Sequence, residues 1–161
     1  MPDANPPDQE SPHCMIPKSN GSVSPPRPED RGLRYDLLLP HKEKFSATSA
    51  GAVATVVTDL VRASQTSDRF RVIGSAVEAP FENIDFCPLA VRRRWLHGGN
   101  IGFAEAYLNM LRSRAAPDLV EVHGRCHVAA HIKSKRPDLR VALYLHNDPR
   151  NMKGGSTVAA R

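Results

Sequence analysis

The 161-residue sequence is short of cysteine, of aromatic residues and of long apolar runs. Its three cysteines are too few and too scattered for a disulfide framework, which favours a reducing compartment. No stretch approaches the roughly 18 uninterrupted apolar residues that a membrane-spanning helix needs. The first residues also lack the basic and apolar regions of a secretory signal. The sequence therefore predicts a cytoplasmic protein.

Aromatic side chains make up only 6% of the residues, although the chain is basic, with a formal net charge of +5. Proteins that bind single-stranded nucleic acids interleave aromatic with basic residues, so the composition argues against a nucleic-acid partner. The densest basic runs are Arg92–Arg94, followed by Trp95, and Lys133–Arg136. Solvated surface charge explains both runs. In the alternative interpretation, the first run binds an anionic membrane surface, with Trp95 at the interface.

Proline is concentrated at one end, because eight of the 14 prolines lie within the first 28 residues. Residues 1–32 contain almost no large apolar side chains. Such a segment cannot bury enough surface to offset the entropy lost on ordering. We therefore predict a disordered Pro-rich tail over residues 1–32 and one folded domain over residues 33–161.

Beyond the tail, short apolar runs alternate with amphipathic segments. Strands are expected at 37–39, 72–77, 119–122 and 141–145, helices at about 50–64, 101–114 and 127–136, and irregular structure at 78–99. The first helix is predicted to bury one apolar face, made of Val53, Val56, Val57, Leu60 and Val61. This alternation predicts an α/β fold, a Rossmann-like parallel sheet flanked by helices on both sides. Ligands of such sheets bind beyond the carboxyl ends of the strands, which selects residues 40–51, 123–127 and 146–157.

The loop between the first expected strand and the first expected helix ends in small residues. Backbone N–H groups beside Ala50 and Gly51 would approach an anion at the helix N-terminus, with Lys42 and Lys44 adding positive charge. The loop is neither a G-x-G-x-x-G nor a Walker A sequence, so it does not support nicotinamide or nucleoside-triphosphate binding. The alternative is a plain helix start capped by Ser49.

Four potential metal ligands lie within nine residues: His123, Cys126, His127 and His131. His127 and His131 are four residues apart and would share one face of a helix, as zinc ligands do. However, no glutamate stands between them as in H-E-x-x-H, and His123 belongs to a different element. A zinc-binding regulator is therefore a weaker hypothesis than core or surface positions for these histidines.

Polar residues follow the last expected strand directly, at His146, Asn147 and Asp148. Hydrogen-bonding side chains at the carboxyl end of a buried strand are what a substrate site requires. His146 would donate a hydrogen bond to a phosphate or sugar oxygen, with the two following side chains orienting it. The alternative is a simple turn at Asp148 and Pro149. A helix expected to begin near residue 158 has barely one turn left, which indicates the front part of a longer protein.

The order and spacing of four segments resemble the amino-terminal domain of bacterial family 4 glycosyltransferases, which have the two-Rossmann GT-B fold. They are the strand ending at Pro40, the loop ending at Ala50–Val53, and the segments Glu121–Arg125 and Leu143–Arg150. The likeness covers about residues 34–161. In that family the first loop lies near the donor diphosphate, and a histidine closing a later strand assists phosphate departure. The resemblance thus implies that His146 is catalytic, and that Ala50, Gly51, Arg125, Asn147 and Asp148 bind substrate.

The resemblance implies the acceptor-side half of a retaining glycosyltransferase. Such an enzyme would move a sugar from a nucleotide-sugar donor to a saccharide or lipid-linked acceptor in bacterial polysaccharide or glycolipid synthesis, at the inner face of the membrane. No metal or other cofactor is expected. The family's nucleotide-sugar-binding second domain does not follow, so we expect a domain incomplete at its C-terminal end and inactive alone. The alternative is an inactive Rossmann-like module that binds a partner or an anionic surface.

Overall fold

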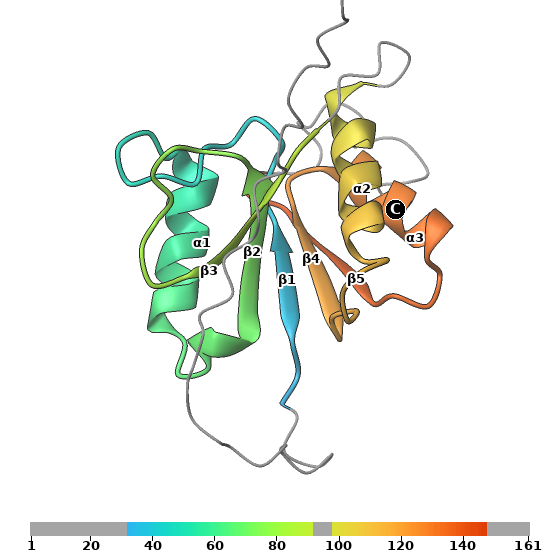
Figure 1. Ribbon diagram of the computed structural model, residues 1–161, viewed down its shortest axis with the longest axis horizontal. Helices are drawn as coiled ribbons and strands as arrows, with labels where there is room; N and C mark the ends of the chain where they lie inside the picture. The colour runs from blue at the N-terminus through green and yellow to red at the C-terminus, as the bar shows by residue number, and fades with distance from the viewer. Residues whose placement is uncertain (1–31, 92–97, 148–161) are drawn as a thin grey trace, which may run out of the picture.

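The computed structural model describes residues 32–91 and 98–147 (Figure 1). In chain order its elements are β1 (Tyr35–Leu38), α1 (Ala52–Ala63), the 3-10 turn η2 (Ser67–Arg69), β2 (Phe70–Ser75), β3 (Asp85–Leu89), α2 (Gly99–Met110), β4 (Leu119–His123), α3 (Cys126–Lys135) and β5 (Val141–Tyr144). The predicted Pro-rich tail, the first basic run and the segment from Asp148 onward lie outside the described residues, apart from Gly32 at the end of the tail.

The five strands form one parallel sheet in the order β3-β2-β1-β4-β5. In the centre of the sheet, Leu37 of β1 is opposite Val72 of β2 on one side and Glu121 of β4 on the other. The chain therefore starts in the middle of the sheet, adds two strands on one side and then two on the other. This Rossmann-like α/β arrangement confirms the predicted fold class.

Successive residues of β1 point to opposite faces of the sheet, and each face has its own hydrophobic core. Leu37 and Leu39 pack with residues of α1, whereas Leu38 packs with residues of α2 and α3. Figure 1 shows α1 to the left of the strands and both α2 and α3 to the right. The continuous apolar run in β1 thus reflects burial on both faces, as predicted.

The prediction of irregular structure over residues 78–99 is wrong, because this stretch contains β3 and the start of α2. Pro88 argued against a strand, since proline cannot donate to a ladder of hydrogen bonds. However, β3 is an edge strand whose described neighbour is β2 alone, and edge strands tolerate proline. Pro88 lies opposite Gly74, where a Cβ atom would come within 3.1 Å of the Phe86 ring.

The buried face of α1 differs from the predicted one. Val57 and Val61 are buried as expected, but Val56 and Leu60 keep 41% and 40% of their surface exposed. The sheet covers a stripe of the helix that is completed by Ala54 instead. Counting apolar residues overestimated the width of this stripe, because only the residues that face the sheet directly can be covered by it.

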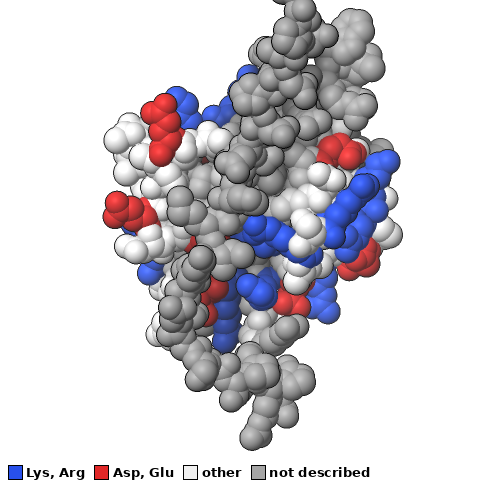
Figure 2. Space-filling model, in the orientation of Figure 1, with Lys and Arg blue, Asp and Glu red and all other residues white. Residues whose placement is uncertain are grey.

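The second basic run lies at the C-terminal end of α3 and bonds the segment that follows the helix. The ammonium of Lys133 donates hydrogen bonds to the carbonyls of Pro137 and Leu139, at 2.8 and 2.9 Å, and Arg136 forms a two-pronged ion pair with Asp138. Cations are favourable at this end of a helix because unpaired carbonyls carry partial negative charge there. Figure 2 shows basic side chains gathered over α3. Part of this charge is therefore used in contacts within the chain.

A buried polar network ties α2 to the sheet. Asp36 in β1 is only 2% exposed and accepts two hydrogen bonds from the Arg71 guanidinium, at 2.9 and 2.8 Å. The Tyr107 hydroxyl of α2 donates a third, at 2.7 Å. Burial, with the negative charge of Asp36 next to it, raises the pKa of Tyr107 well above its usual value, so the hydroxyl keeps its proton. The charged Arg71 guanidinium and the neutral Tyr107 hydroxyl therefore compensate the buried Asp36 carboxylate together.

We predict unequal costs for breaking this network. Tyr107→Phe removes one donor and should lower the free energy of unfolding by about 1–2 kcal/mol. Asp36→Ala leaves the Arg71 charge without its partner and should cost about 3–5 kcal/mol. Urea unfolding measures both values. The exposed pair Arg136–Asp138 supplies the control, since Asp138→Ala should change stability little. Equal costs for Asp36→Ala and Asp138→Ala would contradict the structural role of the network.

Candidate functional site

The carboxyl edge of the sheet gathers the three loops that the sequence selected. All strands are parallel, so the segments following β1, β4 and β5 emerge at the same edge. The N-terminus of α2 joins them, because Nδ1 of His41 in the first loop lies 3.0 Å from Oδ1 of Asn100. A Cβ atom at Gly99 would fall 2.5 Å from Nε2 of the same imidazole. Any larger residue at this position would therefore require the His41 ring to shift.

Two histidines meet at the ends of β4 and β5. Nδ1 of His123 and Nε2 of His146 lie 2.9 Å apart in hydrogen-bonding geometry. His123 is 1% exposed, and the ring of Tyr144 stacks on it with 5.2 Å between ring centroids. Gly124 follows with a φ of 63°, a left-handed conformation that turns the chain away from the strand at little cost. The predicted site residue His146 is thus held by a buried partner.

A carboxylate lies on the far side of His123. Oε1 of Glu121 is 3.0 Å from Nε2 of His123. The contact does not have the geometry of a hydrogen bond, so both buried atoms lack a hydrogen-bond partner among the described residues. Sequence reasoning missed Glu121, although residues two apart on a strand share a face. The two-residue spacing between Glu121 and His123 was the signal in the sequence that could have indicated this contact.

The electrostatic surroundings favour neutral His146. Burial lowers the pKa of the His146 imidazole below its ordinary value, and neighbouring His123 lowers it further. The carboxylates of Glu43 and Glu121 partly oppose this shift. Uncharged His146 therefore dominates at neutral pH, with one N–H donor and one lone pair.

The N-terminus of α1 holds a carboxylate of the chain itself. Gly51 is the N-cap residue, and the backbone N–H of Ala54 donates to Oε1 of Glu43 at 3.0 Å. A Cβ atom on Gly51 would collide with the same carboxylate. The alternative of a Ser49 cap is wrong, since Ser49 lies two residues before the N-cap and its N–H donates to the Ser46 carbonyl. Lys42 and Lys44 are exposed nearby.

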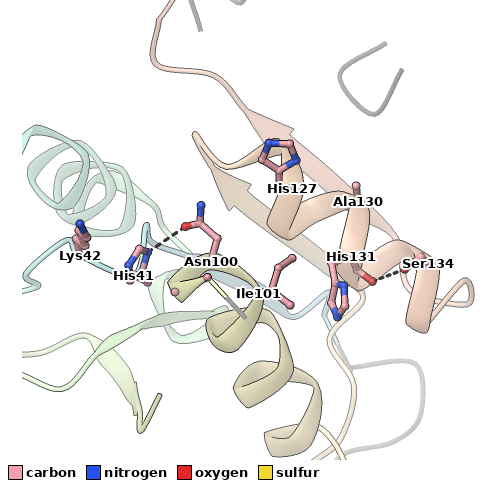
Figure 3. Close-up of a pocket in the computed structure, with 10 residues that line it drawn as sticks. His41, Lys42, Asn100, Ile101, His127, Ala130, His131 and Ser134 are labelled. Atoms are coloured by element: carbon pink, nitrogen blue, oxygen red, sulfur yellow. Dashed lines mark hydrogen bonds between the residues drawn. The ribbon is translucent and has the colours of Figure 1, made fainter. Parts of the chain in front are cut away.

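A cavity of about 710 Å³ opens beside these loops (Figure 3). His41 and Lys42 of the first loop line one side, and Gly99 and Asn100 at the start of α2 line its floor. The opposite wall is one face of α3, made of His127, Ala130, His131 and Ser134 at helical spacing. Both walls therefore carry polar groups within a largely apolar lining, and none of the described lining residues is a carboxylate.

The remaining predicted site residues are spread out. Arg125 is exposed at the N-cap of α3, Asn147 is exposed after β5, and Ala50 packs beside the α1 core. Asp148 lies outside the described residues. The structure places predicted residues from all three loops at one edge, but in separate positions along it.

The four potential metal ligands do not converge. His123 faces His146, while Nε2 of His131 lies 2.6 Å from the Glu105 carboxylate of α2. Cys126 is buried at the start of α3. Among residues 32–91 and 98–147, no three His, Cys, Asp or Glu side chains are placed to hold a metal ion. The zinc hypothesis therefore gains no support from the structure.

Comparison with known proteins found no matching family model and no matching curated protein. Within the described part of the chain, none of the helices is both long and apolar enough to cross a bilayer. Function must therefore be inferred from the chemistry of the carboxyl edge.

The lowered pKa of His146 predicts how stability depends on pH. Because the folded state disfavours the imidazolium, stability from this site is complete above the unfolded pKa of about 6.5 and declines as pH falls below it. The free energy lost in His146→Gln should therefore be smaller at pH 5.5 than at pH 7.5. Urea unfolding of both proteins at both pH values measures it. A larger loss at pH 5.5 would show that the folded state favours the imidazolium.

Proposed function

We propose that this protein is the acceptor-side half of a retaining glycosyltransferase that resembles family 4 enzymes with the GT-B fold. Its reaction would transfer a sugar from a nucleotide-sugar donor to a saccharide or lipid-linked acceptor in polysaccharide or glycolipid synthesis. The observation that carries the proposal is the placement of His146 and its buried partner His123 at the carboxyl edge, where Rossmann-like sheets bind ligands. The resemblance itself supplies the reaction.

The cavity suits the acceptor in size and in the hydrogen-bonding groups that line it. About 710 Å³ falls within the usual range of small-molecule sites. Its imidazole, amide and hydroxyl groups can exchange hydrogen bonds with sugar hydroxyls, and Lys42 adds a positive charge. A saccharide or the headgroup of a lipid-linked acceptor would bind here, between the first loop and α3.

The donor side depends on the α1 N-terminus and on His146. In the complete enzyme, backbone N–H groups near Gly51 would stabilise charge that develops on the leaving diphosphate, and the His146 side chain would lie near the transferred sugar. Glu43 now bonds one of these N–H groups, and its charge has the same sign as a diphosphate. Donor binding at this position therefore requires the Glu43 side chain to move away. A second domain would grip the remainder of the nucleotide.

The occupied helix terminus favours a second candidate, an inactive Rossmann-like module that binds a partner or an anionic surface. A module without a donor has no need for free N–H groups at α1, and Glu43 satisfies one of them. Nucleotide sugars separate the two candidates, because only the transferase should be stabilised by them.

We predict that UDP-glucose or GDP-mannose at ten times its dissociation constant raises the melting temperature by about 3–6 °C. At that concentration the bound ligand stabilises the folded state by about 1.4 kcal/mol. His146→Ala should abolish the shift. His131→Ala changes the cavity wall and leaves the histidine pair intact, so it should keep the shift. Thermal denaturation of the wild type and the two variants, with and without the nucleotide sugar, measures these shifts. Absence of a shift with every nucleotide sugar favours the binding module.

We also predict that Glu43→Ala strengthens diphosphate binding. Removing a like charge from a helix N-terminus should improve the affinity for pyrophosphate about fivefold, the ratio that corresponds to roughly 1 kcal/mol. Isothermal titration calorimetry measures the affinity. Asp59→Ala is the matched control, because it removes an exposed carboxylate from the middle of the same helix. Equal affinities of the Glu43 variant and the wild type would place the diphosphate elsewhere.

A further inference from the structure

Glu121, His123 and His146 form a continuous row of polar groups that begins in the sheet and ends at the candidate site. The first contact joins Oε1 of Glu121 to Nε2 of His123 at 3.0 Å, and the second joins Nδ1 of His123 to Nε2 of His146 at 2.9 Å. His123 is buried in the middle, so each of its ring nitrogens faces one named neighbour. The proton positions along such a row are coupled.

The carboxylate decides where His123 carries its proton. Ionised Glu121 can only accept, so an unprotonated Nε2 at 3.0 Å would bring two lone pairs together. A proton on Nε2 turns this repulsion into attraction, even at the imperfect angle of the contact. A neutral His123 therefore carries N–H at Nε2 and a lone pair at Nδ1.

The same logic determines the tautomer of His146. The 2.9 Å hydrogen bond needs one donor, and Nδ1 of His123 has only a lone pair, so Nε2–H of His146 donates. Nδ1 of His146 is then unprotonated. We infer that Glu121 and His123 are positioning residues that present His146 to the ligand as a hydrogen-bond acceptor through Nδ1.

An acceptor nitrogen recognises a hydroxyl group and cannot bond to an ionised phosphate oxygen. The inference therefore deepens the proposed function, on which the identity of the ligand rests: Nδ1 of His146 contacts a sugar hydroxyl, and the diphosphate lies elsewhere. This reverses the expectation that His146 donates to the ligand. A donating Nδ1–H in a neutral His146 would require Nδ1 of His123 to carry a proton. The other described carboxylate that acts on His146 is Glu43, which approaches from the first loop.

The tautomers can be measured without a ligand. Long-range proton–nitrogen correlation spectra of the 15N-labelled full chain at pH 7.5 distinguish protonated from unprotonated ring nitrogens. We expect N–H at Nε2 and a bare Nδ1 for both His123 and His146. A protonated Nδ1 in His146, or two protonated nitrogens in His123, overturns the inference on the wild-type protein alone.

Variants of Glu121 test the cause. Glu121→Ala should raise the Nδ1–H population of His146 about tenfold, because the charge-assisted contact that selects the tautomer is gone. The uncharged amide of Glu121→Gln can both accept and donate, so this variant should give an Nδ1–H population between those of the wild type and Glu121→Ala. Glu105→Ala removes the carboxylate beside His131 and should leave His146 unchanged. An unchanged His146 tautomer in folded Glu121→Ala overturns the positioning role of Glu121.

The ligand assignment has its own measurement. UDP-glucose and GDP-mannose carry sugar hydroxyls, and at least one of them should shift the Nδ1 signal of His146, whereas UDP and GDP should not. A shift produced equally by UDP or GDP overturns the hydroxyl assignment. If no nucleotide sugar shifts the signal, the proposed donor chemistry fails for this chain, and so does the assignment of a donor-sugar hydroxyl. The tautomers, read from the ligand-free spectrum, are decided separately.

Discussion

Parallel pairing of β1 with β2 on one side and β4 on the other determines where every described loop emerges. Because strands of one direction end at one edge, His41, Glu43, His123 and His146 lie at the same end of the molecule despite spanning more than 100 residues. The buried carboxylate of Asp36 reinforces this centre by bonding Arg71 of β2 and Tyr107 of α2. The site therefore depends on a rigid sheet, and loops alone could not position it.

Two carboxylates give the carboxyl edge its chemical character. Glu43 bonds the N-terminus of α1, and Glu121 faces the buried nitrogen of His123. The first occupies a position where an anionic ligand would otherwise be favoured, and the second sets the protonation of a neighbouring histidine pair. A cavity whose polar groups are imidazole, amide, hydroxyl and ammonium lies beside them, with no carboxylate among its described lining residues. The cavity is therefore suited to hydroxyl groups. At the N-terminus of α1, in contrast, an anionic ligand must first displace the carboxylate of Glu43.

Much of the fold was predictable because apolar periodicity reports burial. Alternating strands and helices predicted the parallel sheet, and the position of His146 after the last strand predicted its place at the carboxyl edge. Proline at Pro88 concealed β3, because whether a proline is tolerated depends on the strand being at an edge. The exposed Val56 shows that apolar spacing alone does not tell which part of a helix surface is covered. Glu43 escaped notice because its partner is a backbone N–H eleven residues away.

The sequence by itself determined the fold class, the direction of the strands and the candidate segments, since each of these follows from local patterns of apolar and polar residues. Only the tertiary structure decided which side chains meet. His123 and His146 are 23 residues apart in the chain, and their contact requires β4 and β5 to pair in the observed register. Glu121 joins them because a strand places alternate residues on one face. Long-range register is a property of the whole sheet, which no local pattern contains.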